Sequence, residues 1–338
     1  MMNCRNSTME LLRIFAMVLV MITHASFLSF GVPTQSDILN RPFYSFNVFF
    51  FQGISIVCVN VFILLSGWFG LSWKPSRILS LFFQVFFFSS LIILFLYLFG
   101  QDRTINVHSL RSLFFLNSSD YWFFKAYLGL YIISPIINIF FKYSPQRQVG
   151  QILLIFFCFQ TIYGWMSLYG AQWLEGGYSA FSFIGLYLLA KYIRTYPNAI
   201  TNKKAKYYIL FYLSSAFLLA ILSIILVSNG LEIVGRFYTY TNPLIICMSV
   251  SLLLFFTKLK PIYNKLINWI ASSCFAVYLL HANELILRPF FGKNIYNLYQ
   301  SHYGLIFVSY LLFFLFTFFA VAILLDKIRL WLWNKIAC

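Results

Sequence analysis

Apolar residues follow one another along almost the whole chain in stretches of about 20, separated by short polar segments. Ten stretches reach this length, with expected limits of 9–30, 45–70, 76–99, 121–141, 149–169, 177–194, 207–228, 240–258, 269–288 and 304–331. About 20 apolar residues in a helix cross the hydrocarbon core of a bilayer. The pattern therefore predicts an all-α, polytopic integral membrane protein of about ten transmembrane helices, surrounded by membrane lipid, with one membrane-embedded domain over residues 1–338.

The composition agrees with this fold class and excludes a soluble domain. Hydrophobic residues make up 61% of the chain and charged residues only 9%, whereas a soluble domain carries about 25% charged residues. The net charge of +16 would suggest nucleic-acid binding in a soluble protein. Here the basic residues lie mostly between apolar stretches, which is typical of cytoplasmic loops. We expect no nucleic-acid partner, but some of these cations remain available for an anionic cytosolic ligand.

The distribution of basic residues also predicts an orientation. With the N-terminus in the cytoplasm, 17 of the 24 Lys and Arg residues fall in inner segments and 7 in outer ones. An excess of Lys and Arg marks the cytoplasmic side. The sequence therefore predicts a multi-pass protein of the inner (cytoplasmic) cell membrane with both termini in the cytoplasm.

The cysteines indicate neither a disulfide framework nor a metal site. They are scattered singly, without a CxxC pair, at Cys4, Cys58, Cys158, Cys247, Cys274 and Cys338. Four of them lie inside apolar stretches, where a cysteine behaves as a small hydrophobic side chain. We predict no disulfide and no metal.

Ionisable residues inside the first stretch are candidates for function, because charge is costly within a membrane. Glu10 and Arg13 are three residues apart and share a helix face. His24 lies eleven residues after Arg13, on the same face and about 16 Å further along the axis. The structural alternative is that Arg13 extends to the inner interface and that His24 is a packed core residue.

The ninth stretch carries a second set, formed by Tyr278, His281 and Glu284. His281 and Glu284 are three residues apart, and His281 has a depth similar to that of His24. The two histidines would line one outward-facing cavity if their helices are neighbours. The Ser66–Gly67 pair allows close helix packing, which we favour, or the approach of a ligand. The aromatic outer segment around Trp165 and Tyr178 is either an interfacial belt or a platform for sugar rings.

Four segments, in order, resemble one known family of membrane proteins. The first is Glu10-Leu-Leu-Arg13 followed by His24. The second, Val61–Phe69, contains an FxLSG-like element, and the third, Tyr121–Pro135, has the spacing W-F-x-x-x-Y-x-x-x-Y-x-x-x-P. The fourth is Tyr278-Leu-Leu-His281. Together they resemble the membrane acyltransferase-3 family over about residues 8–330.

The resemblance implies an acyltransferase that uses cytosolic acyl-CoA, most often acetyl-CoA, as the donor. The acceptor would be a sugar hydroxyl of an envelope or exopolysaccharide glycan, or of a lipid-linked saccharide. The family's essential His and Arg correspond to His24 and Arg13, and Glu10 belongs to the same signature. Lys74 and Arg77 correspond to basic residues that help to hold CoA. His281 is the alternative general base.

Two other functions remain open from the residues alone. A transporter or flippase for lipid-linked saccharides would show internal repeats and broken helices, and no repeat is evident in the sequence. A glycan polymerase would need a long outer segment, and the longest one here, residues 100–120, is short. An O-acyltransferase is therefore the leading hypothesis.

Overall fold

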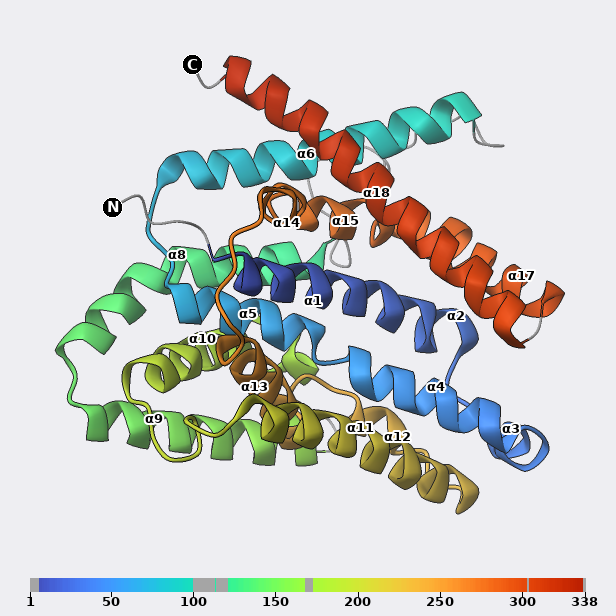
Figure 1. Cartoon of the computed structure of the whole chain (residues 1–338), viewed down its shortest axis with the longest axis horizontal. Coiled ribbons are helices and arrows are strands. Elements are labelled where there is room, and N and C mark those ends of the chain that lie inside the picture. The colour runs from blue at the N-terminus through green and yellow to red at the C-terminus, as the bar shows by residue number, and fades with distance from the viewer. Residues whose placement is uncertain (1–5, 100–112, 114–120, 168–172, 303, 337–338) are drawn as a thin grey trace. The chain divides into compact units, whose positions relative to one another are not determined.

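The structure is a computed structural model that describes residues 6–99, 113, 121–167, 173–302 and 304–336 (Figure 1). Within these residues every regular element is a helix, which confirms the all-α prediction. In chain order the elements are α1 (Ser7–Ala25), α2 (Phe27–Phe30), α3 (Gln35–Asn40), α4 (Pro42–Ser55), α5 (Cys58–Phe69), α6 (Pro75–Phe99), α8 (Trp122–Tyr143), α9 (Gln146–Phe159), the π-helix η1 (Gln160–Met166), the 3-10 turn η2 (Glu175–Gly177), α10 (Ala180–Thr195), α11 (Ala205–Ser228), α12 (Val234–Phe237), α13 (Pro243–Thr257), α14 (Lys265–Ala271), α15 (Cys274–His281), α16 (Glu284–Ile286), the π-helix η3 (Leu287–Gly292), α17 (Lys293–Ser301) and α18 (Gly304–Ile336). Residues 100–120, predicted to be an outer segment too short for a glycan polymerase, lie almost entirely outside the described residues.

The helices are those of a polytopic membrane protein. In the described part of the chain, seven helical stretches are long and apolar enough to cross a membrane, and an eighth is added if a bent pair forms one span. Helices also occupy the other predicted stretches, but α10 has 16 residues and α13 has 15, fewer than the roughly 20 of a full span. The predicted total of ten spans is therefore not established by helix length.

The contacts of the chain divide it into two compact units, and each is described by itself. Unit 1 comprises Met1–Phe27, Gly31–Trp73 and Phe123–Asn264. Unit 2 comprises Leu28–Phe30, Lys74–Trp122 and Lys265–Cys338. The single domain expected over residues 1–338 stays a prediction.

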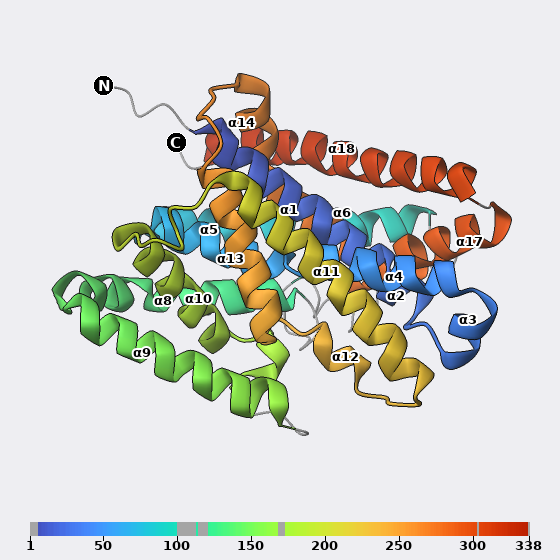
Figure 2. The ribbon, with the colours of Figure 1, turned by 60° about the horizontal axis from the view of Figure 1, so that its bottom comes forward.

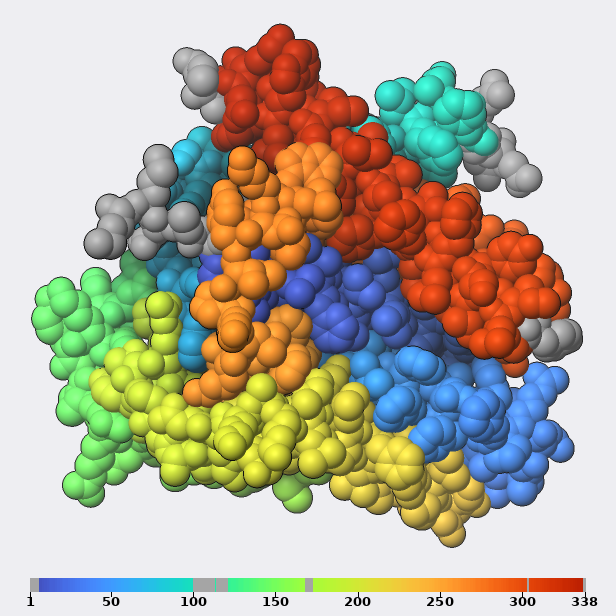
Figure 3. All heavy atoms as spheres, in the orientation of Figure 1, coloured from blue at the N-terminus to red at the C-terminus, as the bar shows by residue number. Residues whose placement is uncertain are grey.

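In unit 1 the central helix is α5. Helices α1, α10 and α13 pack against it, and α11 packs against α4 and α13 (Figures 1 and 2). The outward side of α11, in yellow at the front of Figure 3, is apolar along its length. Its exposed large side chains are Tyr207, Leu210, Phe211, Leu213, Phe217, Leu218, Ile221 and Ile225. A helix that is apolar on all sides suits a membrane environment.

The close contact between α5 and α10 depends on Gly67. A Cβ at this position would stand 2.2 Å from the carbonyl oxygen of Tyr187 and 2.9 Å from the Cβ of Ala190. The backbone of α10 therefore occupies the space that any side chain at residue 67 would need. This confirms the prediction that the Ser66–Gly67 pair serves close helix packing.

We expect Gly67→Ala to destabilise the protein by about 1–3 kcal/mol, because the new methyl group must push the α10 backbone away. The matched control is Gly235→Ala in α12, where a Cβ meets nothing within 4 Å. The measurement is the thermal unfolding midpoint of each purified variant in the same detergent. Equal midpoints for the two variants would contradict the packing argument.

In unit 2, α6, α15 and α18 pack against one another, and α17 packs on α18 (Figure 1). The ninth predicted stretch, 269–288, is not one helix. The segments Lys265–His281 and Glu284–Ser301 meet at an angle of 62°. Asn283 causes this break, because its side chain accepts a hydrogen bond from the backbone N–H of Leu285 at 3.0 Å and so begins a new helix.

Candidate functional site

The N-terminal half of α1 places a charged pair inside unit 1. Asn6 caps the helix by accepting a hydrogen bond from the backbone N–H of Thr8. One turn further along, Arg13 donates a hydrogen bond to Glu10 and forms an ion pair with it. Glu10 is buried and Arg13 is half-buried. The pairing across three residues confirms the predicted shared face, and the buried carboxylate holds the guanidinium in one place.

The start of α1 is held by the segment that follows α13. The hydroxyl of Thr8 donates to the carbonyl of Lys260 at 2.9 Å and accepts from the N–H of Ile262 at 3.1 Å. The hydroxyl of Ser7 accepts from the N–H of Asn264 at 2.8 Å. These bonds fix the first turn of the helix that carries Glu10 and Arg13, so the ion pair stands on a rigid support.

His24 lies in the last turn of the same helix and is half-buried. Because α1 is continuous from Ser7 to Ala25, Arg13 and His24 lie on one face, about 16 Å apart along the axis. The neighbouring Thr23 hydroxyl is 4.0 Å from the sulfur of Cys58, which places this end of α1 against α5. One rigid helix thus carries a cation near its N-terminal end and an imidazole near its C-terminal end.

Two of the segments that carry the family resemblance meet in unit 1. The hydroxyl of Ser66, in the FxLSG-like element, donates to the hydroxyl of Tyr127 at 3.4 Å. The hydroxyl of Tyr131, one turn further along α8, donates to the carbonyl of Ser72 at 2.8 Å. Both tyrosines belong to the W-F-x-x-x-Y-x-x-x-Y spacing, which therefore places two hydroxyl groups against the end of α5 and the loop that follows it.

His281 ends α15 in unit 2 and is buried. Its Nδ1 lies 2.5 Å from the carbonyl of Val277, and because a carbonyl only accepts, Nδ1 carries a proton and donates it to this bond. The ring contacts those of Tyr278 and Phe291. Although His281 and Glu284 are three residues apart in the ninth predicted stretch, they do not lie on one helix, since α15 ends at His281 and α16 begins at Glu284. The proposed grouping of His24 with His281 stays a prediction.

Tyr121 has a role that the sequence did not indicate. In unit 2 its buried hydroxyl donates to the carbonyl of Leu279 at 2.9 Å and accepts from the side-chain amide of Asn283 at 2.7 Å. These contacts hold the chain on both sides of the break after His281. The sequence signal was only the position of Tyr121 at the start of a family-like segment.

Lys74 and Arg77 lie at the start of α6 in unit 2, and both are exposed. The backbone N–H of Arg77 bonds to the carbonyl of Lys74 at 3.0 Å, so the two cations stand on one turn. Exposure suits a role in binding a soluble anion. Their predicted cooperation with Arg13 stays a prediction.

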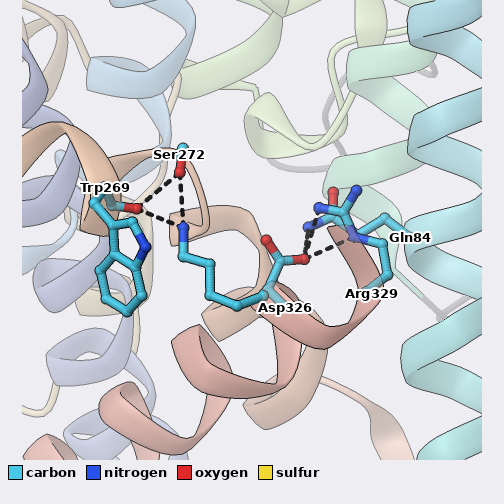
Figure 4. A network of polar contacts seen from close by, with 6 residues as sticks. Gln84, Trp269, Ser272, Asp326 and Arg329 are labelled. Atoms are coloured by element: carbon cyan, nitrogen blue, oxygen red, sulfur yellow. Dashed lines mark hydrogen bonds and ion pairs between the residues drawn. The ribbon is translucent and has the colours of Figure 1, made fainter. Parts of the chain in front are cut away.

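A buried polar network in unit 2 was not found from the sequence (Figure 4). Asp326 Oδ1 accepts from Gln84 at 2.8 Å and from two nitrogens of Arg329 at 2.9 and 2.7 Å. Asp326 and Arg329 are both buried. Beside them, Lys327 donates to the carbonyl of Trp269 at 2.7 Å and to the hydroxyl of Ser272 at 3.0 Å. An acid and an Arg three residues apart in an apolar stretch were the available signal.

Among the described residues there is no group of three His, Cys, Asp or Glu side chains that would hold a metal ion.

Comparison with protein families finds one match: a family model described as an acyltransferase domain covers residues 6–327. Comparison with curated proteins and with solved structures finds no match.

Proposed function

Because this chain belongs to the membrane acyltransferase-3 family, we propose that it is an O-acyltransferase that takes an acyl group from cytosolic acyl-CoA. The acyl group is an acetyl group in the simplest case, and the acceptor is a sugar hydroxyl of an envelope or exopolysaccharide glycan. Family membership makes the protein a transferase of acyl groups. The donor, the acceptor and the sides of the membrane are the content of this proposal.

The observation that carries the proposal is the arrangement on α1. Arg13 is held by buried Glu10 at one end of the helix, and His24 lies on the same face near the other end. A charged pair and an imidazole within a membrane span are costly unless they serve a function. A cation suits the phosphates of the donor, and a histidine suits proton removal from the acceptor.

The donor side follows from the charges. The bias of Lys and Arg places the start of α1 and the turn of Lys74 and Arg77 on the cytoplasmic side, with both termini in the cytoplasm. Coenzyme A is a phosphate-bearing cytosolic molecule, and Arg recognises phosphate through two parallel hydrogen bonds. We therefore assign Arg13, Lys74 and Arg77 to the donor.

The acceptor side follows from the aromatic outer segments of unit 1. The indole N–H of Trp165, in η1, donates to the carbonyl of Arg236 at 3.1 Å, and the ring of Tyr178 packs 5.1 Å from that of Tyr240. Aromatic faces stack well on the apolar faces of sugar rings. Fixed Trp and Tyr rings support a saccharide acceptor at this end of the unit.

In the transfer itself, the sugar oxygen attacks the thioester carbonyl carbon while His24 takes the hydroxyl proton. A C–O bond forms, the C–S bond breaks, and the CoA thiolate leaves. The proton returns from His24 to the thiolate. For this route the pantetheine arm extends along α1 from Arg13 toward His24.

A flippase is the second candidate, because the bent pair of helices in unit 2 is a feature of transporters. Sealed membrane vesicles of both orientations, each containing the acceptor glycan, distinguish the two functions. We expect radiolabelled acetyl-CoA added outside to label the glycan in inverted vesicles and not in right-side-out ones, since acetyl-CoA does not cross the membrane.

Mass spectrometry of the recovered glycan should then show the added mass of one acetyl group. Protease cleavage of a C-terminal tag in inverted vesicles only would report the predicted orientation. Translocation of a lipid-linked saccharide without any change in its mass would instead favour the flippase and contradict the transferase.

A further inference from the structure

A cluster of ordered polar contacts surrounds the loop that follows α5 in unit 1. The hydroxyl of Tyr187, from α10, accepts from the N–H of Leu71 at 2.9 Å and donates to Asn138 Oδ1 at 2.8 Å. The amide nitrogen of Asn138, from α8, donates to the carbonyl of Leu71 at 2.9 Å. Three helices, α5, α8 and α10, which lie side by side in Figures 1 and 2, thus hold this loop in one conformation.

Two cations of α10 belong to this cluster. Lys191 donates to Asn138 Oδ1 at 2.7 Å. Its Nζ would lie 4.0 Å from a Cβ atom if residue 70 were not a glycine. Its charge also lies over the rings of Phe141 and Tyr187. One turn along α10, Arg194 donates to the carbonyl of Trp68, and its guanidinium lies over the Trp68 ring. The fold therefore holds two positive charges at one place, although like charges three residues apart repel.

No carboxylate neutralises these two charges in the described part of the chain. The predicted inner side has two acidic residues, Glu10 and Asp326, and each is paired with an arginine of its own helix. Capping of the last turn of α5 by Arg194 accounts for part of the arrangement. Two fixed positive charges remain at the site, and Lys191 uses only one of its three N–H donors on Asn138.

We propose that Lys191 and Arg194 form a binding site for a phosphate group, and that in this protein the phosphate is one of those of acyl-CoA. The inference rests on the proposed function for its ligand. The loop held by Tyr187 and Asn138 ends at Trp73, and Lys74, the first residue of the basic turn assigned to the donor, follows directly in the sequence. Lys binds phosphate as a point charge and Arg as a planar fork.

The test measures the dissociation constant of acetyl-CoA for the purified full-length protein in detergent. We expect Lys191→Met and Arg194→Met each to weaken binding by about tenfold to a hundredfold, the usual effect of losing a charged hydrogen bond. Lys191→Arg, which keeps the charge, should retain most of the affinity. The matched control is Lys142→Met, which removes an exposed cation at the end of α8 and should leave binding unchanged.

The same titration with 3′-dephospho-acetyl-CoA identifies the phosphate. A loss in Lys191→Met that is confined to the 3′-phosphorylated form assigns the site to the 3′-phosphate. An equal loss for both forms assigns it to the pyrophosphate. Either result supports the proposal.

Two results would overturn the proposal and leave the proposed function intact. One is normal acetyl-CoA affinity in a folded Lys191→Met protein. If the same variant also loses a preference for phosphatidylglycerol over phosphatidylcholine nanodiscs, the site is assigned to a lipid headgroup. The other is an equal loss in Tyr187→Phe, which keeps both charges, because the effect would then come from the loop conformation. Failure of the unaltered protein to bind acetyl-CoA would instead contradict the proposed function itself.

Discussion

Replacement of His24 by alanine should lower the rate of acyl transfer by about 10²- to 10⁴-fold, the range that a positioned general base contributes. The affinity for acyl-CoA should stay unchanged, because the phosphates of the donor are assigned to other residues, among them Arg13, Lys74 and Arg77. The measurement is transfer of labelled acetyl groups by purified protein at saturating acetyl-CoA.

The reason for so large an effect is the chemistry of the acceptor. A sugar hydroxyl is a poor nucleophile near neutral pH, so its proton must be removed as the oxygen attacks the thioester. His24 is the residue of α1 that suits this step. It lies in the last turn, away from the Glu10–Arg13 pair, at the end of α1 where the proposed acceptor would arrive.

Two matched variants make this prediction specific. His281→Ala removes the alternative base, which is the last residue of α15. His302→Ala removes a histidine that lies between α17 and α18. We expect normal transfer from His302→Ala. Near-normal turnover in His24→Ala together with a large loss in His281→Ala would transfer the role to α15 and overturn the mechanism.

A covalent route through His24 gives a distinct signature. If the imidazole itself carries the acyl group, incubation with acetyl-CoA in the absence of acceptor should leave an acetylated peptide that contains His24. Mass spectrometry of the digested protein would detect it. Absence of this peptide under conditions of full turnover would leave the general-base route.

The largest effect on stability is expected at Asp326. Asp326→Ala should destabilise the protein by about 3–5 kcal/mol, because it leaves the buried guanidinium of Arg329 without its carboxylate. The same substitution removes the oxygen that accepts a hydrogen bond from Gln84, which is one of the contacts between α6 and α18 (Figure 4). The measurement is the thermal unfolding midpoint in detergent.

The pair itself need not be stabilising, and a double variant separates the two effects. Asp326→Leu combined with Arg329→Met replaces the buried charges by apolar side chains, and such replacements are often neutral or stabilising. We therefore expect the double variant to be far more stable than Asp326→Ala. Asp37→Ala, which removes a half-buried acid that caps α3 together with Thr34, is the control and should have a smaller effect. A midpoint for Asp326→Ala equal to that of Asp37→Ala would contradict the prediction.

The sequence by itself determined the helical membrane fold and the helix face that Glu10, Arg13 and His24 share. Within a bilayer every backbone N–H and C=O must be bonded inside its own segment, so a long apolar stretch has little choice but to form a helix. The pairing of Glu10 with Arg13 and the shared face of Arg13 and His24 follow from the helical repeat alone. Gly67 was likewise interpreted correctly, because a small residue in an apolar helix indicates close packing.

Only the tertiary structure decided where helices break and which distant groups meet. His281 and Glu284 look like neighbours at helical spacing, but Asn283 begins a new helix between them and Tyr121 holds the break from about 160 positions away in the chain. The clamp of Asn138 and Tyr187 on the loop after α5 likewise joins residues from three helices. Periodicity reports only local backbone geometry, whereas these contacts depend on how side chains of separate helices fit together, and no local pattern contains that information.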